Sequence, residues 1–107
     1  MKRFVFIFFT IILVVGLLHG KGHAYKIISG PDAYEMYQNN EELIVVDVRE
    51  KISEYCLYGH IPVALNYPWR SGVFAKEYHN LPTDAAILLV CRSGGRSGDA
   101  ARLLDRN

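Results

Sequence analysis

A cysteine followed by a short glycine-bearing loop is the part of this sequence best suited to chemistry. Cys91 comes directly after the apolar run Ala86–Val90, and the loop leads into a segment with helical spacing, Gly98–Asp105. Glycines let the loop curve so that backbone N–H groups converge on one point, and a helix N-terminus adds partial positive charge there. A cysteine at that point is favoured as the nucleophilic thiolate. The loop residues predicted to bind substrate are Arg92, Ser93, Gly94, Gly95, Arg96 and Ser97.

This loop suits a reaction in which the Cys91 thiolate attacks an anionic substrate. A sulfane-sulfur donor such as thiosulfate fits, because sulfite leaves as an anion and a persulfide remains on the cysteine. A phosphate ester fits less well, since its alkoxide leaving group needs a proton from an acid, and the loop contains none. The residues therefore favour sulfur transfer over phosphoryl transfer, and no cofactor or metal is expected. The alternative is that Cys91 is simply the buried end of a strand.

Alternating strands and helices are predicted to hold this loop in place. Leu43–Val46 and Ala86–Val90 are continuous apolar runs of strand length, typical of strands buried in a parallel sheet. Val63–Tyr67 is predicted as a further short strand. Ser29–Asp32 has the residues of a helix start, and that helix is expected to end at Gln38–Asn40. The pattern predicts an α/β domain with a parallel sheet and helices on both of its faces.

Charged residues follow the first of these buried strands. Asp47 and Arg49 lie where Leu43–Val46 ends, and the carboxyl ends of parallel strands face the ligand crevice of an open sheet. We expect the two residues to shape the site by pairing with each other and with loop N–H groups. His60, in a turn before a strand, is expected to be a structural donor rather than a general base.

The first 24 residues have the pattern of a cleavable secretory signal. A basic start at Lys2 and Arg3 precedes fifteen residues without a charge, and small residues follow up to Ala24. Fifteen residues are fewer than the roughly 20 that span a bilayer as a helix, so no stable membrane anchor is expected after cleavage. Residues 1–24 are therefore predicted to be the signal and 25–107 the mature domain, exported to the periplasm or the outside of the cell.

Export bears on the charge and on the two cysteines. Residues 25–107 keep nine of the twelve Lys and Arg and all eleven Asp and Glu, a formal net charge of −2, which argues against nucleic-acid binding. Cys56 lies 35 positions before Cys91, a spacing that does not form a disulfide framework. It is expected to be a small, partly buried apolar residue, and a bridge to Cys91 or a redox role remains open.

Three motifs, in this order, resemble the single-domain rhodanese-type sulfurtransferases over about residues 26–107. The resemblance implies a five-stranded parallel sheet flanked by helices, with Cys91 as the sulfur carrier and the backbone of residues 92–97 as the substrate cradle. It also implies a small sulfur-containing anion as donor and a thiol or cyanide as acceptor, with a protein acceptor open. Asp47 and Arg49 would mainly shape the site. The motifs are Val46–Arg49; Gly59–Pro62 with Ala64 and Asn66; and Leu89–Ser97 with Ala100, Ala101 and Leu104.

The sequence departs from this family in places and leaves other functions open. The loop from Cys91 to Arg96 has the six residues of the sulfurtransferases, one fewer than in the related dual-specificity phosphatases. Val63 stands where the family usually has a small residue, and the segment from Arg49 to Gly59 is about two residues longer than is common. A further strand and helix, usual in the family after Leu104, are missing, which would leave an unpaired sheet edge. The alternatives are a non-catalytic rhodanese-like binding module and a thiol-dependent anion reductase or phosphatase-like enzyme.

Overall fold

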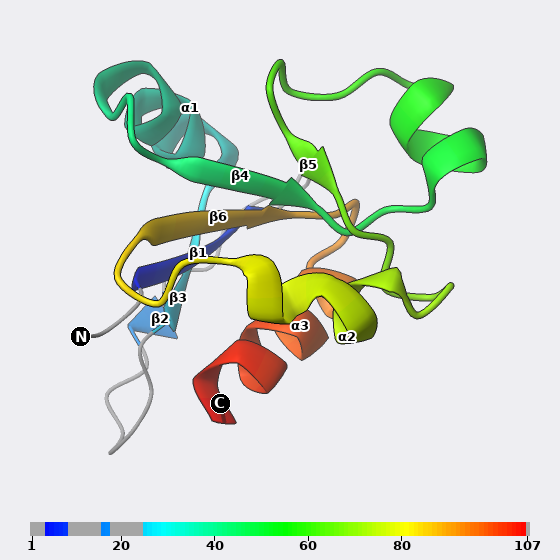
Figure 1. Ribbon diagram of the computed structural model, residues 1–107. Helices are drawn as coiled ribbons and strands as arrows, with labels where there is room; N and C mark the ends of the chain where they lie inside the picture. The colour runs from blue at the N-terminus through cyan, green and yellow to red at the C-terminus, as the bar shows by residue number, and fades with distance from the viewer. Residues whose placement is uncertain (1–3, 9–15, 18–24, 107) are drawn as a thin grey trace.

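The computed structural model describes residues 4–8, 16–17 and 25–106, and it consists of one β-sheet with helices on both faces (Figure 1). The described strands lie in the order β2-β3-β1-β6-β4-β5. Neighbouring strands run parallel except β2 and β3, which are antiparallel. The predicted α/β class with a parallel sheet is confirmed. The strands are β1 (Phe4–Phe8), β2 (Gly16–Leu17), β3 (Tyr25–Ile28), β4 (Ile44–Asp47), β5 (Leu65–Asn66) and β6 (Ala86–Val90).

The central strands β4 and β6 are apolar on both faces because each face packs against helices. Val46 and Leu89 belong to the core cluster that also contains buried residues of α2 and α3. Their neighbours in the chain, Val45 and Leu88, belong to the second cluster, on the side of α1. Successive side chains of a strand point to opposite faces, so a continuous apolar run fills both cores. Figure 1 shows α1 on one side of the sheet and α2 and α3 on the other.

The helices follow the strands along the chain. Helix α1 begins after Ser29, whose Oγ accepts the Asp32 N–H at 3.2 Å, and it ends at the expected place. The segment after Arg49 forms a single π-helical turn, η1, in which the Tyr55 N–H donates to the Glu50 carbonyl at 2.9 Å. The helices are α1 (Gly30–Asn39), η1 (Lys51–Cys56), α2 (Val73–Glu77), the 3-10 turn η2 (Tyr78–Asn80) and α3 (Gly95–Arg106).

Helix α3 starts three residues earlier than the sequence spacing predicts. The expected start was Gly98, but the helix already includes Gly95. The Gly98 N–H donates to the Gly94 carbonyl at 2.8 Å, and Gly94 has a φ of +91°, a conformation that glycine adopts without strain. The chain therefore turns at Gly94, and the last loop residues predicted to bind substrate form the first turn of the helix.

The N-terminal segment contributes a strand to the interior of the sheet. β1 lies between β3 and β6 and pairs with both of them in parallel. It serves as a fifth parallel strand, whereas the missing C-terminal strand was expected to leave an unpaired edge. The predicted signal peptide includes residues outside the described part of the chain, so that prediction, the domain boundary at Ala24 and the predicted export remain predictions. Among the described residues, no helix is long and apolar enough to cross a membrane.

Candidate active site

Cys91 lies at the carboxyl end of β6, beside the end of β4. The Val48 N–H donates to the Val90 carbonyl at 2.9 Å, which brings the residues after the two strands to the same edge of the sheet. The Cys91 side chain is fully buried, at 0% exposure, and belongs to the core cluster on the α3 side. The topology therefore brings Asp47, Arg49 and the cysteine loop together, as the sequence predicts.

The sulfur of Cys91 has two polar neighbours in the turn that starts α3. The Gly94 N–H donates to Sγ at 2.9 Å, and the Ser97 Oγ lies 3.1 Å from Sγ. The Ser97 hydroxyl can also donate to the Gly94 carbonyl, at 3.3 Å, and its side chain is fully buried. Because a hydroxyl has one proton, it can rotate to donate to sulfur when the sulfur is negative. Both contacts favour negative charge on the sulfur at a helix N-terminus.

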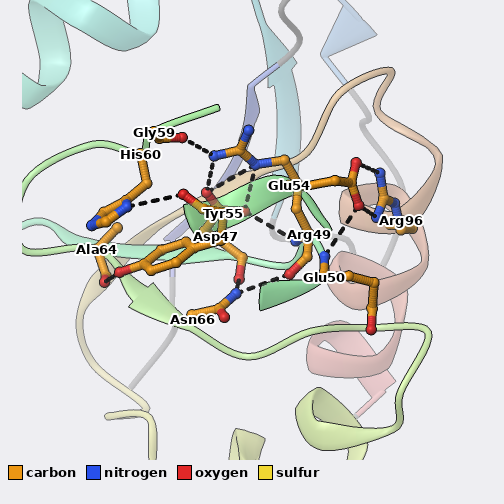
Figure 2. Close-up of polar contacts among 10 residues, drawn as sticks. All are labelled: Asp47, Arg49, Glu50, Glu54, Tyr55, Gly59, His60, Ala64, Asn66 and Arg96. Atoms are coloured by element: carbon orange, nitrogen blue, oxygen red, sulfur yellow. Dashed lines mark hydrogen bonds and ion pairs between the residues drawn. The ribbon is translucent and has the colours of Figure 1, made fainter. Parts of the chain in front are cut away.

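Arg96 is held by a buried acidic residue that the sequence analysis did not single out. Its Nη1 and Nη2 donate to the two carboxylate oxygens of Glu54 at 2.6 and 2.8 Å (Figure 2). The hydrogen bonds from Arg96 are the main reason that the pKa of Glu54 is lowered from 4.5 to about 2. The same bonds raise the pKa of Arg96. Arg96, predicted to bind substrate, therefore has its guanidinium engaged by a carboxylate.

Asp47 and Arg49 form a second bidentate pair beside the first. The Arg49 Nε and Nη2 donate to the Asp47 carboxylate at 3.0 to 3.1 Å and 2.7 Å, and Nη2 also donates to the Gly59 carbonyl at 2.7 Å (Figure 2). Asp47, only 1% exposed, also accepts the Arg49 N–H. The Asn66 amide donates to the Asp47 and Arg49 carbonyls. These contacts fix the ends of β4 and β5, and the site-shaping role of Asp47 and Arg49 stays a prediction.

The front of the loop faces solvent. Arg92 and Ser93 are exposed, and the Arg92 guanidinium lies over the ring of Tyr58, with Cζ 5.6 Å from the ring centroid. A cation over the face of a tyrosine ring is attracted by the ring. This attraction restricts the conformations of the Arg92 side chain. Arg92 is therefore placed at the rim of the loop, whereas Arg96 is directed toward η1.

The remaining candidates lie outside this centre. The His60 ring stacks on Tyr55, with ring centroids 3.6 Å apart, and its Nδ1–H donates to the Tyr55 carbonyl at 3.2 Å. These contacts agree with the predicted structural role of His60.

Cys56 is exposed, not partly buried as expected, because it ends the outward-facing turn η1. Cys56 and Cys91 are both free thiols, so the structure has no bridge between them.

Glu54 is the residue that sequence reasoning missed. It lies in a polar stretch where Glu50, Lys51 and Ser53 look equally exposed, and nothing in its neighbourhood marks it as buried. Its burial comes from the π-helical turn, which the sequence pattern does not predict, and from a partner 42 positions away. A weak signal is Arg96 itself, since an arginine held close to the core is expected to pair with an acid.

The assembled site places hydrogen-bonding groups of the α3 turn around the Cys91 sulfur. Within the part of the chain that the structure describes, no three His, Cys, Asp or Glu side chains are grouped as ligands would be. The donors to sulfur come from the turn at Gly94 and from Ser97, and the arginines are spread from the rim to the core. The arrangement fits a nucleophilic cysteine at the end of a parallel strand.

This fold and site define a family. Residues 30–107 match the rhodanese-like domain, so the chain belongs to the rhodanese-like family. A Bacillus subtilis (strain 168) protein named "Putative sulfurtransferase YtwF" is 35% identical over 80 residues, which cover 75% of this chain and 74% of that protein. No solved structure matches the chain. The family-level prediction of a rhodanese-like single domain with a sulfurtransferase-like function is supported by both matches.

Proposed function

We propose that this protein is a sulfurtransferase that carries sulfane sulfur on Cys91. The observation that carries the proposal is the position of Sγ at the end of β6, where it accepts the Gly94 N–H at 2.9 Å beside the start of α3. Membership of the family and the similarity to YtwF support this chemistry. The donors proposed are thiosulfate or a similar small anion, and the acceptors are cyanide or a thiol, including one on a protein.

The reaction proceeds in two displacements on sulfur. The Cys91 thiolate attacks the outer sulfur of thiosulfate, a bond forms between the two sulfurs, and the bond to the sulfonate breaks with its electron pair leaving on sulfite. In the second step the acceptor, for example cyanide, attacks the outer sulfur of the persulfide. Thiocyanate forms and the Cys91 thiolate is restored. Neither step needs a general acid, because each leaving group departs as a stable anion.

Intact-mass spectrometry of the full chain after incubation with thiosulfate tests the proposal. Wild type is expected to gain the mass of one sulfur atom, which cyanide then removes with release of thiocyanate. Cys56→Ser is the matched control and should gain the same mass, whereas Cys91→Ser should gain none. An adduct that depends on Cys56, or no adduct on a chain shown by circular dichroism to be folded, contradicts the proposal.

The full burial of Cys91 favours a second candidate, a rhodanese-like binding module without turnover. A nucleophile must be reached by its substrate, and this sulfur has 0% exposure. In that case the chain would form no sulfur adduct with any donor. Loss of Cys91 would also leave its biological role unchanged, whereas a sulfurtransferase would lose that role.

A further inference from the structure

Arg96, near the end of the Cys91 loop, forms a fixed ion pair with Glu54 of the turn η1. Arg96 lies in the first turn of α3, next to Ser97, whose hydroxyl is 3.1 Å from the Cys91 sulfur. Both carboxylate oxygens of Glu54 accept from its guanidinium, and the two side chains are only 12% and 11% exposed. A bidentate pair with so little exposure fixes the orientation of the guanidinium.

Glu54 is itself held in position by the turn that carries it. Its Oε1 accepts the Glu50 N–H at 3.2 Å, and the π-helical turn η1 presents the side chain toward α3 (Figure 2). Glu54 is ionised at neutral pH, and its lowered pKa keeps it ionised into the acid range. The positive charge of Arg96 is therefore balanced locally by one negative charge. The neighbouring pair, Arg49 with Asp47, is balanced in the same way.

We propose that Glu54 is a specificity-determining residue that limits how strongly the Cys91 loop attracts multiply charged anions, by engaging the guanidinium of Arg96. The proposal rests on the proposed sulfurtransferase function. In its simplest form, the pair removes most of the advantage that an unpaired Arg96 would give dianions, such as thiosulfate, over singly charged donors, such as organic thiosulfonates and persulfides. Arg96 acts on the donor through its local charge, and Glu54 cancels most of that charge.

Coulomb's law gives the size of the expected effect. The interaction of one cation with an anion is proportional to the anion's charge, so a dianion gains twice the free energy that a monoanion gains. For a donor bound about 6 Å from the Glu54 carboxylate, the screening of bulk water sets the smallest gain, roughly 0.7 kcal/mol per unit charge. Removing the charge of Glu54 should then tighten binding of a monoanion about threefold and of a dianion about tenfold.

Glu54→Gln, which keeps the shape of the side chain and removes its charge, tests the proposal. The matched control is Asp99→Asn, since Asp99 pairs with Arg102 on the exposed side of the same helix. KM would be measured for thiosulfate, a dianion, and for methanethiosulfonate, a monoanion with the same sulfur electrophile. Relative to Asp99→Asn, Glu54→Gln should lower KM about tenfold for thiosulfate and about threefold for methanethiosulfonate. Unchanged or raised KM values, or equal effects on the two donors, overturn the proposal.

Two further measurements keep the test decisive. If circular dichroism shows that Glu54→Gln does not fold, Glu54→Asp keeps the charge but withdraws it by one methylene, and KM for thiosulfate should fall about 1.5-fold; a rise overturns the proposal. If wild type accepts sulfur from neither donor, the proposed function fails. The inference is then decided by calorimetric titration with sulfate, which should bind Glu54→Gln more tightly than Asp99→Asn; equal or weaker binding overturns it.

Discussion

The Glu54 carboxyl should make a pH-dependent contribution to stability that a single substitution can isolate. In the folded chain its pKa is about 2 instead of 4.5, chiefly because Arg96 donates two hydrogen bonds to it. A difference of this size corresponds to roughly 3 kcal/mol of unfolding free energy. The folded pKa lies below the unfolded one, so the contribution is complete above about pH 5. It declines as the pH falls through 4.5 and is lost near pH 2.

Urea denaturation of wild type and Glu54→Gln across this pH range measures the contribution. At pH 7 the variant should be about 3 kcal/mol less stable than wild type, and the difference should shrink steadily toward zero as the pH approaches 2. The control Asp99→Asn removes an exposed partner of Arg102, so it should cost no more than about 0.5 kcal/mol at any pH. A difference between wild type and Glu54→Gln that stays constant with pH would refute the reasoning.

Four further predictions follow from single features of the structure. Val63 is 84% exposed with a φ of +64°, so Val63→Gly should raise the unfolding free energy by about 1 kcal/mol in urea titration, whereas Val63→Ala should gain less; destabilisation by glycine would contradict this. Ser97→Ala removes a hydroxyl 3.1 Å from the sulfur, so stopped-flow sulfur loading should slow about tenfold with KM little changed, and an unchanged rate would argue against the contact. Iodoacetamide should alkylate exposed Cys56 at least about tenfold faster than buried Cys91, as peptide mass mapping would show; equal rates would contradict the burial. Removal of residues 1–24 deletes β1 from between β3 and β6, so the melting temperature should fall by several degrees; an unchanged value would show that the sheet does not need β1.

The parts of the fold that local sequence determines were predicted well. The strand Ala86–Val90 is found with the predicted bounds, because a continuous apolar run must be covered on both faces. Helix α1 begins after Ser29, because its hydroxyl and Pro31 suit the first turn. The start of α3 was placed too late, since the glycines that suggest a loop also permit the turn at Gly94.

The parts that depend on distant contacts could not be predicted from the sequence. The apolar segment at the N-terminus has the composition of a signal peptide. It pairs as β1 because the sheet has room for a strand between β3 and β6, and this depends on the folded sheet and not on the segment alone. In the site, the parallel pairing of β4 and β6 was enough to predict that Asp47 and Arg49 lie at the same edge of the sheet as Cys91. The engagement of Arg96 by Glu54 depends on a π-helical turn, whose extra residue has no signature in the hydrophobic pattern.

The π-helical turn η1 makes the chemistry of the loop sensitive to chain length. A π-helical turn differs from an α-helical one by a single added residue, and each residue of a helix rotates the following side chains by about 100°. Loss of one residue between Glu50 and Glu54 would turn the carboxylate away from Arg96 while leaving the loop itself intact. A one-codon deletion or insertion in this turn therefore offers evolution a simple way to change the charge of the sulfur site without altering any residue that touches the sulfur.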